Sequence, residues 1–407
     1  MKPFSLFLLI LLGGCASVPP APPPRDEPAA PPQPAVEAAA SPAVVIAPPP
    51  PNSIPTKPPV PQAKPAEQPA WADPKAGRAL INTLLPRQIS DRAGWEADIF
   101  NAFTALKIPY TADYVCGAIA VIEQESSWQG DPVVPDLGKD VWKELEQRAH
   151  RHGVPLALVK AALRVKSRNG KSYASRIDAL RTEREMNALF EEMIADAGRF
   201  GLPVNINNPI RTGGPMQVSV AFAEIHSKQW PYPYPINGSL RHEVFSRRGG
   251  VYFGIAHLLH YRIDYPAMLY RFADFNAGRY SSRNAAFQLA LAKLSQRRVV
   301  PDGDLLRNDG QASETELALS ALANSLNMDT ADIKRELQLE KTEQFSQSML
   351  YQRLFALAEK RAHQPLPRAA LPQIRLVSSK ITRKLTTAWF AQRVDGRYRQ
   401  CLTRSAK

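Results

Sequence analysis

The sequence predicts a mainly α-helical protein whose structured region follows a long proline-rich segment. From residue 71 onward, apolar residues recur at helical spacing and runs of β-branched residues are few. Residues 16–70, by contrast, hold 20 of the chain's 38 prolines. With 407 residues, of which 44% are hydrophobic and 22% charged, the chain is long enough for one large helical domain or two smaller ones. Fibrous and wholly disordered classes are excluded.

The N-terminus has the pattern of an exported lipoprotein. Residues 4–12 are apolar, follow Lys2 and are too short to span a bilayer, which is typical of a signal peptide. The sequence LGGC, ending at Cys15, fits a lipobox, in which small residues precede a cysteine that becomes lipidated. We therefore expect residues 1–14 to be a signal peptide and Cys15 to carry the lipid. The alternative is an ordinary secretory signal with an unmodified cysteine.

The residues after Cys15 indicate where such a protein would be held. Ala16 and Ser17 lack the aspartate that retains lipoproteins at the inner membrane, so the sequence favours an outer-membrane anchor facing the periplasm. Residues 15–70, with a proline run at 48–51 and almost no aromatic side chains, cannot build a core. We expect a disordered, proline-rich tether that stiffens toward polyproline II and holds the following domain away from the membrane.

Several stretches of the structured region carry clear helix signals. Apolar residues fall on one stripe of a helix over residues 95–106, and Thr111 is placed to cap a second helix that runs through Glu125. Residues 313–316 give an S-x-x-E capping signal. The other expected helices are three or four amphipathic ones over residues 139–200, with breaks near 153–155, 169–170 and 198–203, one over residues 249–261, and further helices to about residue 360.

These signals divide the structured region into two parts. We expect a helical domain over residues 71–300, interrupted by inserted helices near residues 139–200, and a helical extension over residues 301–407. Prolines between residues 365 and 372 mark a linker before a basic C-terminal segment. The expected architecture is therefore a mainly α domain with a helical insertion and a helical C-terminal extension.

The chain is strongly basic, with a formal net charge of +13 at pH 7 and a pI near 9.7. From Arg375 onward, nine Lys and Arg side chains accompany a single acid, Asp395. Basic surfaces attract polyanions. For an exported lipoprotein we expect the carboxylates and phosphates of peptidoglycan stem peptides and lipid head groups rather than nucleic acid. A merely solvated basic face is the alternative.

Cys116 and Cys401 are the cysteines that remain after processing. Such sparing use of cysteine is compatible with an exported chain in an oxidising periplasm. The pair either forms a disulfide or stays as two buried thiols. The sequence leaves both open, because it cannot show that positions so far apart come within bonding distance.

The sequence AVIEQESSW, residues 120–128, contains the strongest candidate for a catalytic residue. Glu125 continues the apolar face formed by residues such as Val115 and Ile122, whereas Glu123 lies on the opposite side, because two residues along a helix rotate by roughly 200°. At a helix end and beside apolar residues, the charged form of Glu125 is disfavoured, which raises its pKa. A glutamate of this kind suits a general acid. The alternative is a capping or surface glutamate without a role in catalysis.

Two further motifs follow in the chain. Residues 212–219 form a glycine turn followed by Met-Gln, and residues 273–278 end a helix with Asn-Ala-Gly. The ordered set E-S-x-W, G-x-M-Q and N-A-G resembles the soluble lytic transglycosylases, whose fold is similar to goose-type lysozyme. Residues 250–259 look like the helix that links the last two motifs in that family. The resemblance covers about residues 111–290 and implies a lysozyme-like helical domain.

The resemblance implies a reaction and the residues that carry it. Glu125 matches the glutamate that protonates the bond after N-acetylmuramic acid, and the sugar's own hydroxyl then attacks to give an anhydro end. The substrate's N-acetyl group can stabilise the oxocarbenium-like state, so no second carboxylate, metal or cofactor is implied. The expected partners are peptidoglycan glycan strands and, through the lipid, the membrane. Ser126 would orient the acid, and the positions matching the sugar cleft are Gly214, Met216, Gln217, Phe275 and Asn276.

Three departures from the family pattern keep other functions open. Phe275 replaces the family's tyrosine, His257 stands where a tyrosine is common, and the insertion near residues 139–200 lengthens the gap between the first two motifs. One alternative is a muramidase of the same fold that admits water, for which Asp131 and Asp136 are the nearby carboxylates. The other is a non-catalytic scaffold that binds glycan strands.

Overall fold

The computed structural model describes residues 73–199, 208–307, 309–376 and 385–405. The predicted signal peptide, the lipid site at Cys15 and the proline-rich tether lie outside the described residues. All described residues belong to one compact unit. Among their helices, none is both long enough and apolar enough to cross a membrane.

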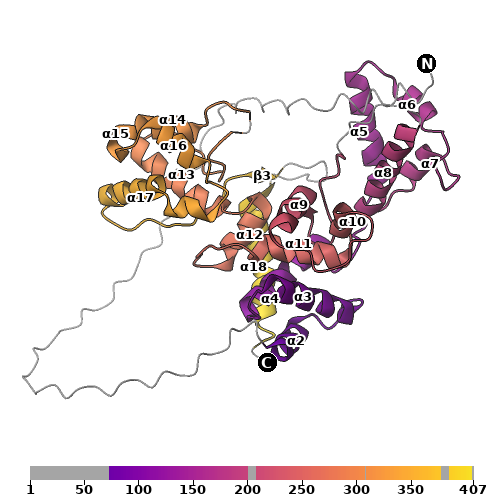
Figure 1. The fold of residues 1–407 in the computed structure, drawn as a ribbon, viewed down its shortest axis with the longest axis horizontal. Coiled ribbons are helices and arrows are strands. Elements are labelled where there is room, and N and C mark those ends of the chain that lie inside the picture. Colours follow the sequence, from indigo (N-terminus) through magenta and orange to yellow (C-terminus); the bar gives the residue numbers. More distant parts are fainter. Residues whose placement is uncertain (1–72, 200–207, 308, 377–384, 406–407) are drawn as a thin grey trace, which may run out of the picture. The chain divides into compact units, whose positions relative to one another are not determined.

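The described residues are mainly helical, as the sequence predicts. Within them, strands form two short antiparallel pairs: β1 (Thr212–Gly213) with β2 (Val218–Ser219), and β3 (Arg375–Leu376) with β4 (Leu385–Thr386). The helices, shown in Figure 1, are α2 (Pro74–Leu84), α3 (Arg92–Leu106), α4 (Ala112–Ser126), α5 (Leu137–Arg151), α6 (Leu156–Ala162), α7 (Tyr173–Asp178), α8 (Glu183–Arg199), α9 (Val220–Gln229), α10 (Leu240–Phe245), α11 (Arg247–Leu259), α12 (Met268–Ala277), α13 (Ser281–Ser295), α14 (Glu314–Ala321), α15 (Ala323–Leu326), α16 (Thr330–Leu337), the 3₁₀ helix η2 (Glu343–Gln347), α17 (Met349–Ala362) and α18 (Thr387–Leu402).

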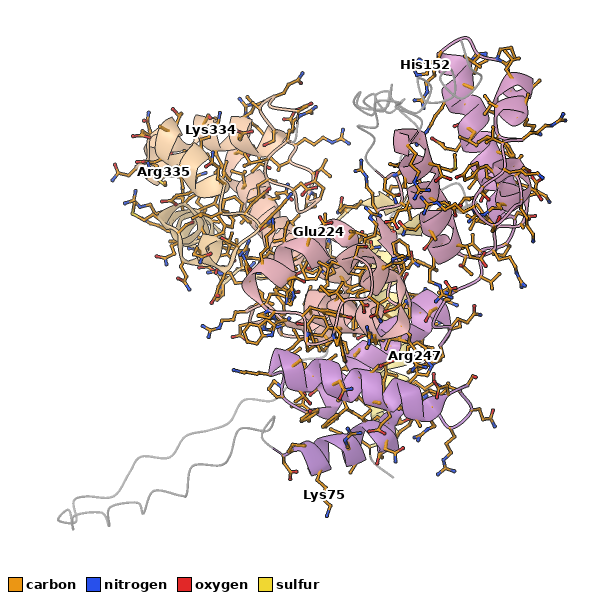
Figure 2. All side chains as sticks on the ribbon, turned by 45° about the vertical axis from the view of Figure 1, so that its right-hand side comes forward. Lys75, His152, Glu224, Arg247, Lys334 and Arg335 are labelled. Atoms are coloured by element: carbon orange, nitrogen blue, oxygen red, sulfur yellow. A yellow bond between two sulfur atoms is a disulfide. The ribbon has the colours of Figure 1, made fainter. Side chains whose placement is uncertain are left out.

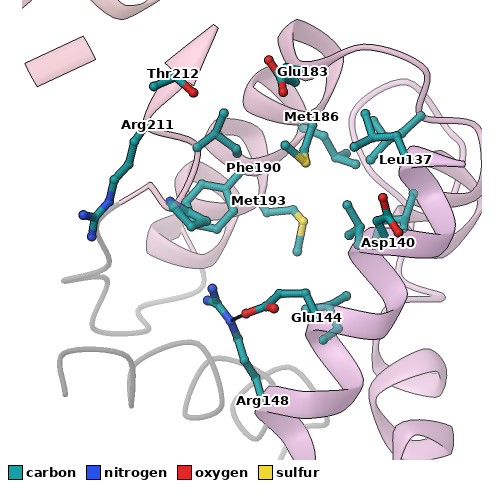
Figure 3. A pocket seen from close by; sticks show the side chains of 17 residues that line it. Leu137, Asp140, Glu144, Arg148, Glu183, Met186, Phe190, Met193, Arg211 and Thr212 are labelled. Carbon is teal, nitrogen blue, oxygen red and sulfur yellow. Dashed lines mark hydrogen bonds and ion pairs between the residues drawn. The ribbon is translucent and has the colours of Figure 1, made fainter. Parts of the chain in front are cut away.

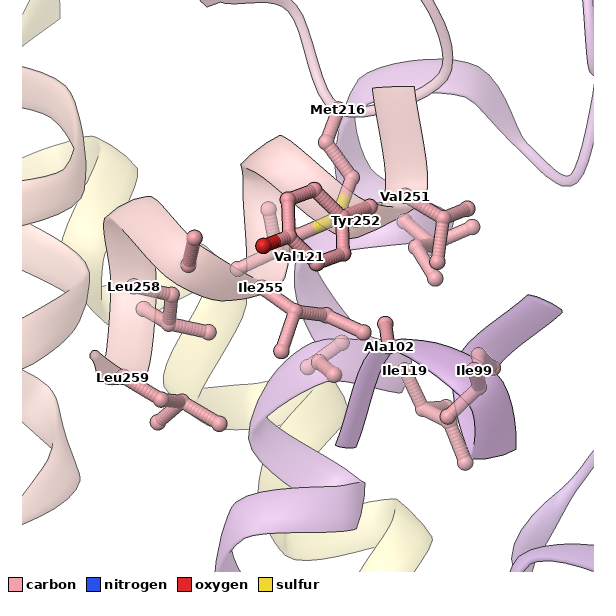
Figure 4. Packing of buried hydrophobic residues seen from close by; sticks show 14 of the residues in the cluster. Ile99, Ala102, Ile119, Val121, Met216, Val251, Tyr252, Ile255, Leu258 and Leu259 are labelled. Atoms are coloured by element: carbon pink, nitrogen blue, oxygen red, sulfur yellow. The ribbon is translucent and has the colours of Figure 1, made fainter. Parts of the chain in front are cut away.

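The largest hydrophobic core is built mainly by α3, α4, α11, α12 and α18. Trp95, Ile99 and Phe103 of α3 are almost completely buried, which confirms the apolar stripe predicted for this helix. Figure 4 shows side chains such as Ile119 of α4 and Ile255 of α11 packed in this core. Burying one large apolar side chain contributes about 1.5–3 kcal/mol, so this core firmly supports the helices that carry the candidate site.

Ion pairs at the edge of this core fix α11 against α3. Arg247, labelled in Figure 2, is the first residue of α11, and its Nε lies 2.6 Å from Oδ2 of Asp98. The same guanidinium pairs with Asp91 and lies 5.3 Å from the ring centroid of Trp95. A cation above an aromatic face and between two carboxylates binds both helices together.

Helix α4 begins where the sequence predicts. Thr111 caps it, because the backbone N–H of Tyr114 donates to Oγ1 of Thr111 at 3.2 Å. The helix ends at Ser126, and Ser127 takes the left-handed conformation, with a φ of 48°. This change of direction ends the helix and leaves Glu125 in its last turn.

Helices α5 to α8 form the inserted layer, which has a hydrophobic cluster of its own. The predicted amphipathic helices and the breaks between them are confirmed at Gly153, after α5, and at Gly170, before α7. In the interior of this layer, the hydroxyl of Tyr173 donates to Oδ2 of Asp196 at 2.6 Å. The inserted layer is therefore a packed structure and not an extended loop.

A further hydrophobic cluster is formed by α13 to α17. Ser313 and Glu316 form the predicted capping box of α14, with reciprocal backbone-to-side-chain hydrogen bonds of 3.0 Å and 2.8 Å. Helix α18 packs instead on α4 and α12 of the first core. Cys116 of α4 and Cys401 of α18 form a disulfide, with Cα atoms 5.5 Å apart. Of the two states that the sequence leaves open for these cysteines, the structure shows the bridge.

Candidate functional site

Glu125 lies half-buried in the last turn of α4. Burial, together with the nearby carboxyl group of Glu183, raises its pKa from the ordinary glutamate value to about 7. Glu123 points to another side of the helix, where its Oε1 lies 3.8 Å from Nε of Arg397 on α18. The two glutamates of the motif are therefore apart, as the helical spacing predicts, and Glu125 keeps a proton in part of the molecules near neutral pH.

The second carboxyl group at the site comes from the inserted layer. Glu183 is the first residue of α8, and the side-chain amide of Gln217 donates to its Oε2 at 3.0 Å. The next residue, Arg184, binds Oδ2 of Asp131 at 2.6 Å. These contacts tie the start of α8 both to the Met-Gln turn and to the segment that follows α4.

The sequence carries a local signal for the start of α8. The backbone N–H of Glu185 donates to Oγ1 of Thr182, and the backbone N–H of Thr182 donates to Oε2 of Glu185, both at 3.2 Å. This T-x-x-E pattern places Glu183 in a first helical turn. It does not reveal that this turn approaches Glu125, because that depends on how the inserted layer folds back.

The Met-Gln turn joins β1 to β2. Gly214 has a φ of +74°, and a Cβ atom there would collide with the carbonyl oxygen of Val244, so only glycine fits without strain. Gln217 has a φ of +50°, and its amide also donates to the carbonyl oxygen of Gly214 at 3.3 Å. Met216 is completely buried against Gly254 of α11. Its side chain therefore supports the turn from within the core and does not face a glycan strand, contrary to the expectation from the motif.

Gly214→Ala is expected to lower the free energy of unfolding by about 2–4 kcal/mol. Alanine would be strained in the left-handed conformation, and its Cβ would overlap the carbonyl oxygen of Val244. Gly153→Ala is the matched control. Gly153 has a φ of +68° but open space around the added Cβ, so only the backbone strain of about 1–2 kcal/mol remains. Urea unfolding followed by far-UV circular dichroism measures both variants. Equal losses would show that the contact with Val244 has no effect.

Helix α12 ends within the Asn-Ala-Gly motif, at Ala277, and the glycine of the motif, Gly278, has a φ of +114°. Asn276 is exposed, and its Oδ1 accepts a hydrogen bond from the hydroxyl of Thr387, at 2.8 Å, at the start of α18. Phe275 packs against His257 of α11, with ring centroids 5.2 Å apart. The motif is thus held by α11 and α18.

Asp274 is a buried acid in this motif that the sequence analysis did not single out. Its Oδ2 accepts hydrogen bonds from the hydroxyls of Tyr261 at 3.1 Å and Tyr265 at 2.7 Å, and from the backbone N–H of Tyr280 at 2.9 Å. Burial raises the pKa of Asp274, and hydrogen bonds from Ser282, Tyr265 and Tyr261 counteract that effect. The network fixes the chain around the end of α12, which is a structural role.

Ser126, expected to orient the acid, is buried and bonded within its own helix. Its hydroxyl donates to the carbonyl oxygen of Ile122 at 2.8 Å. A serine has a single O–H donor, so this hydrogen is not directed at Glu125. The contact ties the hydroxyl back onto the last turn of α4, so Ser126 affects Glu125 only through the position of the helix.

The aspartates in the segment after α4 are engaged in ion pairs. Asp131 binds Arg184 of α8, and Asp136 lies 2.7 Å from Nζ of Lys139 near the start of α5. The charged group that raises the pKa of Glu125 is Glu183. The carboxyl group whose charge acts on Glu125 is therefore Glu183, to which no motif of the sequence points.

Helix α11 connects the later motifs. Its Gly250 approaches Gly214, its Gly254 contacts Met216, and its last turn touches Phe275. Glu125 joins this assembly from α4 through the inserted layer. Among the described residues, no hydrogen bond or ion pair links Glu125 to the Asn-Ala-Gly motif. Helix α4 also packs directly on α11 and α12, so the helices that carry the motifs share one core, while α8 adds contacts to the Met-Gln turn and to the segment after α4.

A cavity of about 420 Å³ lies between α5, α8 and the segment that leads into β1. Figure 3 shows Met186, Phe190 and Met193 of α8 around it, with Glu183 and Thr212 at its upper edge. The same edge leads into the Met-Gln turn. The inserted layer therefore borders the candidate site with a largely apolar wall.

Comparison with protein families relates this site to other chains. A family model described as "Protein of unknown function (DUF1615)" matches residues 88–404. The chain belongs to this family. The part matched to DUF1615 includes Glu125, Glu183 and both disulfide cysteines. The chain is also similar to "Uncharacterized protein YaiW" of Escherichia coli (strain K12), at 46% identity over 325 residues that cover 80% of this chain and 89% of that protein. No solved structure matches this chain.

Proposed function

We propose that this member of the DUF1615 family is a peptidoglycan lytic transglycosylase with a lysozyme-like helical fold. The observation that carries the proposal is Glu125, half-buried at a helix end, with a pKa raised to about 7. A carboxyl group of this kind retains a proton near neutral pH and can transfer it to a glycosidic oxygen. The contact of the Met-Gln turn with Glu183, whose charge acts on Glu125, supports the same assignment, since these motifs belong together in the family that the sequence resembles.

The proposed reaction cleaves the bond between N-acetylmuramic acid and N-acetylglucosamine. Glu125 donates its proton to the glycosidic oxygen as the bond to the anomeric carbon breaks. The resulting glutamate takes a proton from the muramic acid's own hydroxyl, whose oxygen attacks the anomeric carbon and closes the anhydro ring. The acid is regenerated and no water is consumed, while the substrate's N-acetyl group stabilises the cation-like state.

The proposed location follows from the N-terminal sequence. A lipid on Cys15 would anchor the chain in the outer membrane, facing the periplasm, and the proline-rich tether would carry the helical part toward the cell wall. The net charge of +13 favours contact with the carboxylates of stem peptides.

The test is to digest purified sacculi with the full chain and to weigh the released muropeptides by mass spectrometry. Anhydro-ended products, each one water lighter than the reducing-end product of hydrolysis, support the proposal. Reducing ends would identify a muramidase instead. Binding to sacculi without release of any muropeptide would identify a non-catalytic scaffold and would overturn the enzymatic assignment.

A further inference from the structure

We propose that a cavity beside Tyr261 binds a small organic anion, whose carboxylate or phosphate group is held by Arg271 and Arg279. The cavity has a volume of about 960 Å³ and lies between the end of α11, the loop before α13, the loop before α4 and the 3₁₀ helix η2. Neither Glu125 nor the Met-Gln turn nor the Asn-Ala-Gly motif lines this cavity. The site is therefore separate from the candidate active site, and its occupation does not depend on the proposed reaction.

The two arginines are cations inside the protein that no carboxylate of the described residues matches. Arg271 of α12 is 7% exposed, and Arg279 is half-buried just after that helix. Nη1 of Arg271 donates to the carbonyl oxygen of Leu258 at 3.3 Å, and Nε of Arg279 donates to that of His257 at 3.1 Å. Within the described part of the chain, all hydrogen bonds of the two guanidinium groups go to backbone oxygens, and neither group is in an ion pair. A buried charge without a counter-charge is costly, so an anion in the cavity would stabilise both groups.

The two guanidinium groups lie near each other, at one aromatic ring. The central carbon of the Arg271 guanidinium lies 4.6 Å from the ring centroid of Tyr261, and that of Arg279 lies 5.0 Å from the same centroid. Burial and, to a smaller extent, the charge of Arg271 lower the pKa of Arg279 to about 10, so Arg279 still carries its charge at neutral pH. The pair is therefore one concentrated positive site, in which the two like charges repel each other until an anion joins them.

The other charged groups of the cavity wall leave it positive. Asp264 and Glu343 line the cavity, and neither is in an ion pair with the two arginines. Lys107 and Arg262, both exposed, add two further cations to the wall. With the two buried arginines, the cavity has four cationic side chains and two carboxylates, so its field attracts anions.

Acids elsewhere in the chain do not supply the missing counter-charge. Asp274 is the buried acid nearest in sequence, and its carboxylate accepts hydrogen bonds from Tyr261, Tyr265 and the backbone N–H groups of Tyr280 and Ser282. Aspartate and glutamate are absent from four stretches outside the described part of the chain, which are residues 200–207, 308, 377–384 and 406–407. The positive charge of the cavity is therefore available to a ligand.

The donors and rings of the cavity indicate the chemistry of that ligand. Nη1 of Arg279 makes no hydrogen bond to the described residues, which leaves two N–H groups for the oxygens of a carboxylate or phosphate. Trp230, Tyr261 and Tyr280 also line the cavity, and aromatic faces pack well on a ring-shaped ligand. A volume of about 960 Å³ is within the range of sites for small molecules. We therefore expect a ring-bearing anion of the size of a sugar phosphate or a sugar acid.

The experiment titrates the full chain with glucose 6-phosphate, glucuronate and glucose by isothermal titration calorimetry. These probes share one ring and differ in having a phosphate, a carboxylate or no anionic group. We expect at least one of the two anions to bind and glucose to show no binding, and the anion that binds more tightly identifies the preferred group. Binding of neither anion, or equal binding of glucose, would overturn the inference.

Arg279→Gln tests whether the arginine holds the anion. The loss of charge-assisted hydrogen bonds should weaken binding by about 10- to 100-fold, and Arg279→Lys, which keeps the charge but not the planar fork, should lose less. Arg335→Gln is the matched control, since Arg335 is an exposed arginine of α16 outside the cavity and its loss changes the net charge equally. An equal loss in Arg279→Gln and Arg335→Gln would show that the overall charge, and not this cavity, attracts the anion.

A second measurement locates the anion without changing either arginine, in case Arg279→Gln fails to fold. The chain is labelled with ¹⁵N-tryptophan, and the indole N–H signal of Trp230 is identified by its absence in Trp230→Phe. Addition of the anion that binds should shift the signal of Trp230, which lines the cavity, and leave that of Trp389 on α18 in place. Binding that does not shift the Trp230 signal would place the anion elsewhere and contradict the proposal.

Discussion

Replacing Glu125 by glutamine should lower the rate of anhydro-muropeptide release by about 10²–10⁴-fold, the range expected when a general acid is removed. Glutamine keeps the size of the side chain and its half-buried position in α4, but it carries no acidic proton for the glycosidic oxygen. The rate is measured by chromatography of the products released from sacculi at a pH below 7, where the wild-type acid is mainly protonated.

Glu123→Gln is the matched control, since it makes the same chemical change within the same motif. Glu123 lies on another side of α4, in a partly exposed ion pair with Arg397, and such pairs contribute about 0–1 kcal/mol. Its release rate should stay close to that of the wild type. A similar loss in both variants would contradict the assignment of Glu125 as the acid.

Stability separates a loss of chemistry from a loss of fold in Glu125→Gln. Burial and Glu183 raise the pKa of Glu125 from 4.5 to about 7, so the folded state binds more protons than the unfolded state between these values. The contribution of protonated Glu125 to the free energy of unfolding is complete below pH 4.5 and is lost as the pH rises through 7. Glutamine does not titrate, so the variant should be more stable than the wild type at pH 8. Its advantage in free energy of unfolding over the wild type should be smaller at pH 5. Urea unfolding at both pH values checks this order.

Loss of the disulfide should have the largest effect on stability. The double variant Cys116→Ser, Cys401→Ser is expected to lower the free energy of unfolding by about 2–5 kcal/mol. The bridge joins residues separated by 285 positions, so it removes a large part of the freedom of the unfolded chain. It also joins α4, which carries Glu125, to α18. Urea unfolding under oxidising conditions measures the change.

A reducing agent provides the control for the disulfide. Reduction should move the unfolding midpoint of the wild type toward that of the double serine variant, while the midpoint of the variant should not respond. If the wild type unfolds at the same urea concentration with and without reductant, the bridge does not contribute to stability as argued.

Much of the fold could be predicted because the deciding signals are local. Thr111 caps α4 and Ser313 caps α14, and in both cases a side-chain oxygen satisfies a backbone N–H within the same turn. Breaks at Gly153 and Gly170 likewise follow from conformations that glycine adopts easily. Pairings between distant helices, such as α4 with α18, leave no local signal, and a pair of cysteines permits them without requiring them.

In the candidate site, too, features set by local sequence could be predicted and contacts between distant segments could not. The half-buried position of Glu125 follows from the apolar face of its own helix, and its raised pKa agrees with that prediction. Glu183 could not be predicted, because an amphipathic pattern shows which face of α8 is buried but not which residues it meets. A sequence motif also does not show how deeply each of its side chains is buried. Met216 matched a position of the sugar cleft, yet the absence of a side chain on Gly254 lets it lie entirely inside the core.

The return of α18 to the first core has a consequence for how the polypeptide matures. A chain is synthesised N-terminus first, so the apolar surfaces of α4 and α12 that α18 covers stay exposed until the residues of α18 have followed. Such a delay exposes the nascent chain to aggregation and to chaperone binding. Completion of this core therefore depends on α18, and in a molecule truncated before it the surfaces of α4 and α12 that α18 buries would face solvent.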